Sequence, residues 1–344
     1  MSGLAAFLDA APGETRGVVV RNGRFERLII HRDGDLAQHR LGARSVGRVA
    51  AVDPGLRGAF VDLGAREPFG FLPLKKTDRP AVGQKIEVEV AAEPRADKGP
   101  ALRLIGAGEG EPRLLAAGPT AAALLARLAP GVEVRTGAPA MRAAHEAGEE
   151  ALAPGGLFAH LGVSLAVERT RALVAVDIDH AAAPGRDGTR DKGRANREGL
   201  MQAARLIRLK GWGGLVAVDL VGVGQDGAAT SALAKAAFGD EAEVVIGPVN
   251  RFGVLMLSLP WRWTPVEERL LGPDGRPTAE TRAIAGVRAL RLAVATDTAS
   301  PWLTLRCAPD EAAWAAAWIE TLGPRARLTS DPATAPGDAR IEEG

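Results

Sequence analysis

Two segments of the sequence are nearly identical, and each delivers an aspartate at the end of an apolar run. They read LVAVDID at 173–179 and LVAVDLV at 215–221. Short runs rich in valine and other apolar residues are typical of strands buried on both faces of a parallel sheet. The segment between them has the apolar period of an amphipathic helix at 196–210. The strand–helix–strand order predicts an α/β sheet whose two strands end at the same edge.

Asp177 and Asp219 occupy the same position in these segments, so neighbouring strands would bring them side by side. Two adjacent carboxylates repel each other unless one takes a proton or a cation lies between them. Carboxylate ligands without thiols favour a hard cation, Mg²⁺ or alternatively Mn²⁺. Asp179 is on the same face and is a candidate third ligand or orienting group. The alternative is that these aspartates only cap helices or turns.

Charge and composition narrow the class of protein. The chain of 344 residues is 46% hydrophobic and 25% charged, which suits a globular protein of two or three domains. Its net charge is only +1, but residues 185–210 contain eight basic against three acidic side chains. The sequence contains no apolar run long enough for a membrane span. The single cysteine, Cys307, excludes an intrachain disulfide. This cysteine count, together with an N-terminus unlike a secretory signal, indicates a cytoplasmic location.

Short strand-like segments with glycine-rich turns fill residues 36–108. Five strands in so short a stretch favour a small barrel of the OB kind. The candidate strands are 45–52, 59–63, 70–73, 85–90 and 101–105. Before them, residues 16–31 alternate around Asn22-Gly23, which predicts a hairpin with a type I′ turn.

Phe60 and Phe71 fall on strands of this expected barrel. Aromatic side chains on such a surface can stack on unpaired bases. Lys98, on the loop before the last strand, is a candidate phosphate contact. The alternative is that both phenylalanines belong to the barrel core, and their spacing does not decide between the two.

Three runs of the sequence together resemble the ribonuclease E/ribonuclease G family of bacterial endoribonucleases. The first is GRVAAVDPGLRGAFVDLG with GFLPL, which resembles the family's S1-type RNA-binding domain. The second runs from AVDID through RLIRLKGWGGLVAVDLV, and the third is NRFGVLMLS. These two resemble the family's DNase I-like catalytic subdomain. The likeness covers most of residues 16–320.

The resemblance implies a multi-domain α/β and α+β protein. An RNase H-like subdomain, shortened here, would carry the S1-type barrel as an insertion, followed by the catalytic subdomain and a small C-terminal α+β domain. The implied ranges are 1–35 with 109–171 for the RNase H-like subdomain, 36–108 for the S1-type OB-fold, 172–269 for the DNase I-like subdomain, 277–330 for the small domain, and 331–344 for a disordered tail.

The resemblance also assigns roles to individual residues. Asp177 and Asp219 match the family's magnesium-binding aspartates, and Asp179 stands where the family usually has an asparagine that orients the attack. RNA-binding positions are matched by Phe60, Phe71, Lys98 and Arg251. A sensor for a 5′-monophosphate is matched by Arg135 and Thr136.

The implied activity is Mg²⁺-dependent cleavage of single-stranded RNA, in the processing or decay of rRNA or mRNA, that leaves 5′-phosphate and 3′-hydroxyl ends. The alternative is an RNA-binding family member with little or no cleavage. Residues 270–277, LLGPDGRP, lack the thiols of the family's zinc-link, so we expect no zinc and no zinc-linked tetramer, and a homodimer stays open. The segment from Arg135 to Asp177 is also shorter than in long family members, which argues against a complete 5′-end sensor.

Overall fold

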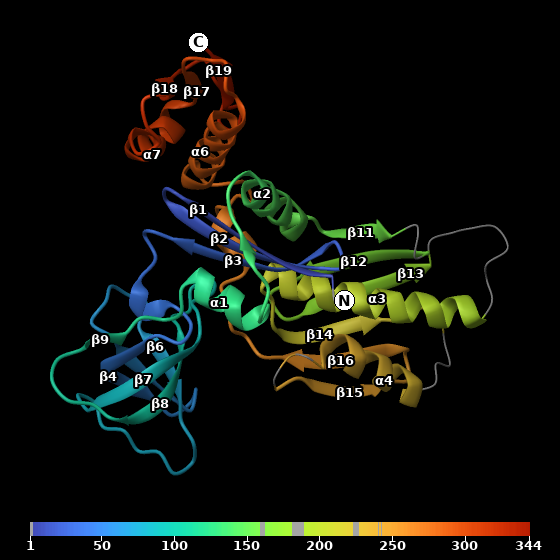
Figure 1. The fold of residues 1–344 in the computed structure, drawn as a ribbon. Helices are drawn as coiled ribbons and strands as arrows, with labels where there is room; N and C mark the ends of the chain where they lie inside the picture. The colour runs from blue at the N-terminus through green and yellow to red at the C-terminus, as the bar shows by residue number, and fades with distance from the viewer. Residues whose placement is uncertain (1–2, 159–161, 181–188, 223–226, 240, 242) are drawn as a thin grey trace. The chain divides into compact units, whose positions relative to one another are not determined.

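The computed structural model describes the chain except for residues 1–2, 159–161, 181–188, 223–226, 240 and 242. It contains helices and several sheets, as expected for a mixed α/β and α+β protein (Figure 1). The chain divides into two compact units. Unit 1 comprises residues 1–149 and 264–344, and unit 2 comprises residues 150–263. None of the helices in the described part of the chain is long and apolar enough to cross a membrane.

Unit 1 begins with a sheet in the order β10-β1-β2-β3. Its strands are β1 (Leu4–Ala11), β2 (Glu14–Arg21), β3 (Arg24–Arg32) and β10 (Val134–Arg135). The expected hairpin is confirmed, since Asn22 and Gly23 both have positive φ, at 52° and 76°, as a type I′ turn requires. The helices that follow the barrel in the sequence are α1 (Ala121–Leu128) and α2 (Ala138–Leu152).

A closed β-barrel follows the first hairpin. Strand β4 pairs with both β5 and β7, and the ring closes through β6 and β8. Its strands are β4 (Arg44–Asp53), β5 (Gly58–Asp62), β6 (Gly70–Pro73), β7 (Lys85–Ala92) and β8 (Ala101–Ala107), while β9 (Arg113–Ala116) adds to the outer side of β4. The five expected strands are therefore confirmed, and the sheet extends past residue 108 to β9.

The C-terminal part of unit 1 packs two helices on a small sheet in the order β18-β17-β19. The elements are α5 (Val266–Leu270), α6 (Ala279–Thr296), β17 (Leu303–Cys307), α7 (Pro309–Glu320), β18 (Ala326–Ser330) and β19 (Arg340–Glu343). The expectation of a disordered tail at 331–344 is wrong, because β19 pairs antiparallel with β17. Ile341 packs against the core of this sheet, and Glu342 forms an ion pair with Arg306 at 2.7 Å.

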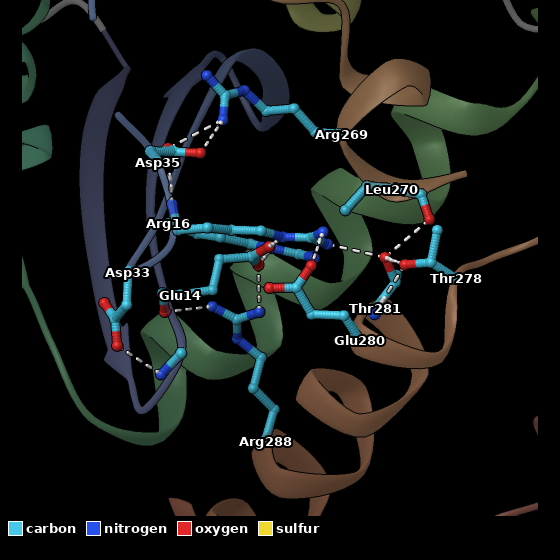
Figure 2. A network of polar contacts seen from close by, with 12 residues as sticks. Glu14, Arg16, Asp33, Asp35, Arg269, Leu270, Thr278, Glu280, Thr281 and Arg288 are labelled. Carbon is cyan, nitrogen blue, oxygen red and sulfur yellow. Dashed lines mark hydrogen bonds and ion pairs between the residues drawn. The ribbon is translucent and has the colours of Figure 1, made fainter. Parts of the chain in front are cut away.

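Buried ion pairs join this C-terminal part to the N-terminal hairpin. Glu14 on β2 is fully buried and accepts hydrogen bonds from Arg16, Arg32 and Arg288, the last of which comes from α6 (Figure 2). Arg288 also donates to Asp9 on β1 at 2.6 Å. These contacts explain why residues 264–344 belong to the same compact unit as the N-terminus.

Unit 2 is a six-stranded sheet with the order β11-β12-β13-β14-β16-β15. Its elements are β11 (Gly155–Phe158), β12 (Val163–Arg169), β13 (Val174–His180), α3 (Thr189–Lys210), β14 (Gly214–Asp219), α4 (Gly227–Phe238), β15 (Val245–Val249) and β16 (Val254–Leu259). Strands β11 and β12 fall in the range 109–171 that the resemblance assigns to the RNase H-like subdomain, but they extend the same sheet as β13. The unit therefore begins near residue 150 and not at 172.

Candidate functional site

The two aspartate-bearing strands are neighbours, as the near-repeat predicts. Strands β13 and β14 pair in parallel, and Asp177 lies directly opposite Asp219 in their register. Val176 and Ile178 are buried, whereas both aspartates are exposed, so the aspartates occupy the sheet face opposite to α3. Helix α3 approaches the other face closely, because a Cβ on Gly199 would lie 2.4 Å from the Ile178 side chain.

The carboxylates at this position influence one another. Desolvation raises the pKa of the Asp177 carboxyl, and the negative charges of Asp179 and Asp219 raise it further. Asp179 is on the same face as Asp177, and its Oδ1 accepts a hydrogen bond from the His180 backbone N–H at 2.9 Å. This concentration of negative charge is the condition under which a bound cation is stabilising.

Two carboxylates, and not three, form the candidate cation site. Among the residues that the structure describes, no group of three or more histidine, cysteine, aspartate or glutamate side chains is arranged to hold a metal ion. Mg²⁺ is commonly held by one or two carboxylates together with waters and substrate phosphates. The donor set of Asp177 and Asp219 fits that pattern, with Asp179 as a nearby charge.

Small side chains lie on the β12 and β13 side of the aspartate pair, whereas Val254 and Met256 lie on the β16 side. In the register of the sheet, Ala166 on β12 lies beside Asp177, and Ala175 and Ala217 form the adjacent row. These side chains rise little above the sheet surface. A bulky polyanion can therefore approach the carboxylates from this face.

A buried asparagine fixes the chain just beyond Asp219. Asn196 on α3 is only 2% exposed. Its Oδ1 accepts from the Val221 N–H at 2.8 Å, and its Nδ2 donates to the Val221 carbonyl at 3.2 Å. Val221 is two residues after Asp219, so Asn196 restricts the end of β14. Sequence reasoning did not identify Asn196, because its partner is a backbone group 25 residues away.

The hairpin between β15 and β16 lies at the same edge of the sheet. Val254, its first residue on β16, is opposite Asp219. Asn250 holds the turn, since its Oδ1 accepts from the N–H groups of Phe252 at 2.9 Å and Val254 at 3.1 Å. The guanidinium of Arg251 lies 4.8 Å from the centre of the Phe252 ring. The predicted Arg251 therefore lies in the turn that precedes Val254, the residue opposite Asp219.

Phe252 is a functional candidate that the sequence analysis missed. Its side chain is 69% exposed although it is large and apolar. It sits on a turn that Asn250 and Gly253 (φ +84°) define, and the Arg251 guanidinium lies over its ring. An exposed aromatic in a rigid turn is suited to stacking on a base. The NRFG motif was the available signal, since it places an aromatic in a turn.

In unit 1, Phe60 and Phe71 lie outside the barrel core. The interior is filled by other side chains, among them Val61 and Leu72, while Phe60 and Phe71 are half-buried on the opposite face of their strands. The two phenylalanines are directly paired across β5 and β6, and their rings meet edge to face at 5.6 Å. Lys98 is exposed on a tight turn that leads to Ala101, the residue beside Phe71. The alternative that both are core residues is wrong.

Arg135 and Thr136 belong to unit 1, at the end of strand β10. Both side chains are exposed. The Arg135 guanidinium lies 5.7 Å from the centre of the Phe7 ring on β1. The candidate residues thus fall into three groups: the edge of the unit 2 sheet, one face of the barrel, and β10.

Comparisons with known proteins match the part of the chain that contains the aspartate pair. A model of the ribonuclease E/G family matches residues 157–259. Over 101 residues, the chain is 32% identical to a protein named ribonuclease E from Buchnera aphidicola and 34% identical to ribonuclease E from Escherichia coli K12. Each match covers 28% of this chain, and 11% and 10% of the two relatives respectively. The chain therefore spans only about a tenth of these relatives.

Proposed function

We propose that the chain is an endoribonuclease of the ribonuclease E/G family that cleaves single-stranded RNA with Mg²⁺; the match of residues 157–259 to the family model supports this. The observation that carries this proposal is the in-register pairing of Asp177 with Asp219 on one exposed face. Cleavage would leave 5′-phosphate and 3′-hydroxyl ends, in the processing or decay of cellular RNA in the cytoplasm.

Asp177 and Asp219 would hold the divalent cation. When bound, this cation supplies positive charge that stabilises the scissile phosphate as negative charge grows on it, and it makes a nearby water a stronger nucleophile. The water oxygen forms a bond to phosphorus while the bond to the 3′ oxygen breaks, and a proton passes to that oxygen. The Asp179 carboxylate, on the same face, is placed to orient the attacking water by accepting a hydrogen bond.

The hairpin at the same edge would position the RNA. The Arg251 guanidinium can pair with a backbone phosphate, which it recognises by charge and by its planar fork of N–H donors. Phe252 offers an exposed ring on which an unpaired base can stack. Ala166, Ala175 and Ala217 leave the space that the sugar–phosphate backbone needs above the sheet.

The barrel would hold the strand at a second position. Phe60 and Phe71 lie paired on its outer surface, with Lys98 exposed on the turn beside them. Small barrels bind single strands without strong sequence preference by stacking bases on aromatic side chains beside positively charged side chains. We therefore assign the barrel as an S1-type RNA-binding domain, the unit 2 sheet as the DNase I-like catalytic subdomain, and the N-terminal sheet as the RNase H-like subdomain.

A cleavage assay with an internal control tests this function. We expect the purified chain to cut a 5′-labelled, AU-rich single-stranded RNA in Mg²⁺ and to leave it intact in EDTA. Asp177→Asn and Asp219→Asn should each reduce the rate at least about a hundredfold while RNA binding persists. Glu168→Gln is the matched control, because Glu168 is an exposed carboxylate on the same sheet face, opposite Ala175.

The same assay separates the enzyme from the binding protein. RNA binding without a metal-dependent product would favour the alternative, for which the replacement of the family's asparagine by Asp179 is the supporting observation. Equal loss of activity in Glu168→Gln and Asp177→Asn would show that the loss is not specific to the aspartate pair, which contradicts the proposed site.

A further inference from the structure

Unit 1 contains a large cleft that the proposed nuclease mechanism does not use. Its volume is about 820 Å³, which is the size of a small-molecule site. Loops of the barrel, the β3–β4 connection, the segment before α6, and helix α7 all contribute to its wall. The cleft combines an aromatic surface with several arginines.

A stacked pair of indoles forms the aromatic wall. Trp314 and Trp318 are one turn apart on α7, with ring centroids 6.1 Å apart and planes inclined by 28°. Trp318 is fixed against the β1–β2 turn, since a Cβ on Gly13 would lie 2.6 Å from its ring. Trp314 stacks on it and is 48% exposed. The pair is a rigid platform with one accessible ring, as base stacking requires.

Two of the arginines in the cleft are fully engaged with the protein. Arg269 donates to both carboxylate oxygens of Asp35, at 3.1 and 3.0 Å (Figure 2). It also donates to Glu93 at 2.9 Å. Arg32 donates to Glu14, to Glu280 at 2.8 Å, and to Thr281. Each of these guanidiniums therefore already makes several hydrogen bonds to the protein, which hold the wall of the cleft in place.

Two other arginines retain donors. The Nε of Arg40 is buried and has no hydrogen-bond partner within the described part of the chain. Arg66 is exposed and forms no hydrogen bond or ion pair with the residues that the structure describes. Desolvation, and secondly the positive charge of Arg66, lower the pKa of His39, which lines the cleft. The charge of Arg66 therefore acts inside the cleft. A buried donor without an acceptor is unfavourable, and an anionic ligand would satisfy it.

The carboxylates of the cleft are mostly hydrogen-bonded or ion-paired within the protein. Asp33 accepts from the Gly13 N–H at 3.1 Å, and Glu268 accepts from the Ala96 N–H at 2.6 Å. Asp35 and Glu280 are held by the two engaged arginines. Among the described lining carboxylates, Glu67 alone makes no such contact. Arg40 donates through Nη2 to the Arg32 carbonyl at 3.0 Å, but its Nε has no partner among the described residues.

We propose that this cleft binds one nucleotide, with its base stacked on Trp314 and its phosphate at Arg40 and Arg66. An aromatic platform and unsatisfied guanidinium donors in one cavity match a planar base that carries a phosphate. The nucleotide is either free or part of a single-stranded RNA. Binding here does not depend on cleavage at Asp177 and Asp219, so either proposal can fail without the other.

Calorimetric titration of the full chain tests the site. The two probes are adenosine 5′-monophosphate and a short oligoadenylate, both in EDTA so that no cleavage occurs. Every variant is made in the Phe60→Ala/Phe71→Ala chain, which lacks the aromatic surface of the barrel and serves as the background. We expect Trp314→Ala to weaken binding about tenfold or more. Arg66→Ala should weaken binding about three- to tenfold, and its binding constant should depend less on salt concentration. Trp314→Phe should retain most of the affinity, and Arg127→Ala, an exposed arginine on α1, should match the background.

The outcomes are distinct. Losses seen with both probes, or with the mononucleotide alone, support the site, and losses seen only with the oligonucleotide identify the ligand as part of an RNA strand. The inference is overturned if neither probe binds, or if Trp314→Ala and Arg66→Ala bind both probes as the background does. Circular dichroism of each variant excludes misfolding as the cause of a loss.

Discussion

Asn196→Ala tests whether the end of β14 must be held for Asp219 to function. The substitution removes the hydrogen bonds of 2.8 and 3.2 Å between Asn196 and the Val221 backbone. Each bond contributes roughly 0.5–1.5 kcal/mol net, so the pair contributes about 1–3 kcal/mol. The better helix propensity of alanine offsets about 0.6 kcal/mol of this. We therefore expect unit 2 to lose about 1–2 kcal/mol of stability.

The effect on activity should exceed the effect on stability. Loosening Val221 lets Asp219 shift relative to Asp177, and outer residues that orient ligands typically affect activity or metal affinity by about 10–100-fold. We expect kcat for RNA cleavage to fall by about that factor at a temperature where the variant is folded. Urea denaturation gives the stability, and cleavage at saturating RNA gives kcat.

Ile207→Val provides a matched control on the same helix. Ile207 is buried at 1% exposure, and loss of one methylene there costs about 0.5–1.5 kcal/mol. Because Ile207 lies eleven residues, about three helical turns, from Asn196 on α3, we expect a kcat within about threefold of the natural chain. If both variants lose similar stability and retain similar kcat, Asn196 only supports the fold, and the argument for positioning is refuted.

Three further outcomes follow from the structure. Phe252→Ala should raise KM about tenfold with little change in kcat, and an abasic nucleotide at the position it stacks on should abolish the difference; an unchanged KM would exclude stacking. Because Arg135 already lies over the Phe7 ring and the segment to Asp177 is short, RNAs with 5′-monophosphate and 5′-hydroxyl ends should be cut at rates within about twofold, and a strong preference that Arg135→Ala removes would contradict this. Burial raises the pKa of Glu14, but the charges of Arg16, Arg288 and Arg32 outweigh burial and lower this pKa from 4.5 to about 2. The ionised Glu14 therefore stabilises the fold above pH 4.5 by about 3 kcal/mol, and this stabilisation is lost as the pH falls toward 2. The difference in unfolding free energy between the natural chain and Glu14→Gln should shrink between pH 7 and pH 3, and a difference that grows at pH 3 would contradict this.

The sequence was sufficient to predict the aspartate pair because the signal was local. The same apolar run occurs twice with its aspartate in the same position, and a helix of suitable length separates the copies. The register of β13 and β14 then follows from burying the valines of both strands. The hairpin at Asn22-Gly23 and the five barrel strands were predictable for the same reason.

Features that depend on distant partners were not predictable. Glu14 and Arg288 are 274 residues apart, and nothing in the local pattern of either indicates a buried ion pair. Strand β19 lies in a polar segment that looked disordered, and only its pairing with β17 makes it a strand. For Phe60 and Phe71, the strands are short, and the direction of each ring depends on how the barrel closes.

The central claim is that Asp177 and Asp219 together hold one divalent cation, and Mn²⁺ titration tests it without RNA. Electron paramagnetic resonance counts free Mn²⁺ directly. We predict one Mn²⁺ bound per chain, competed by Mg²⁺, and binding weakened at least about tenfold in Asp177→Asn and in Asp219→Asn but not in Glu168→Gln. Unchanged Mn²⁺ binding in the double variant Asp177→Asn/Asp219→Asn would contradict the account.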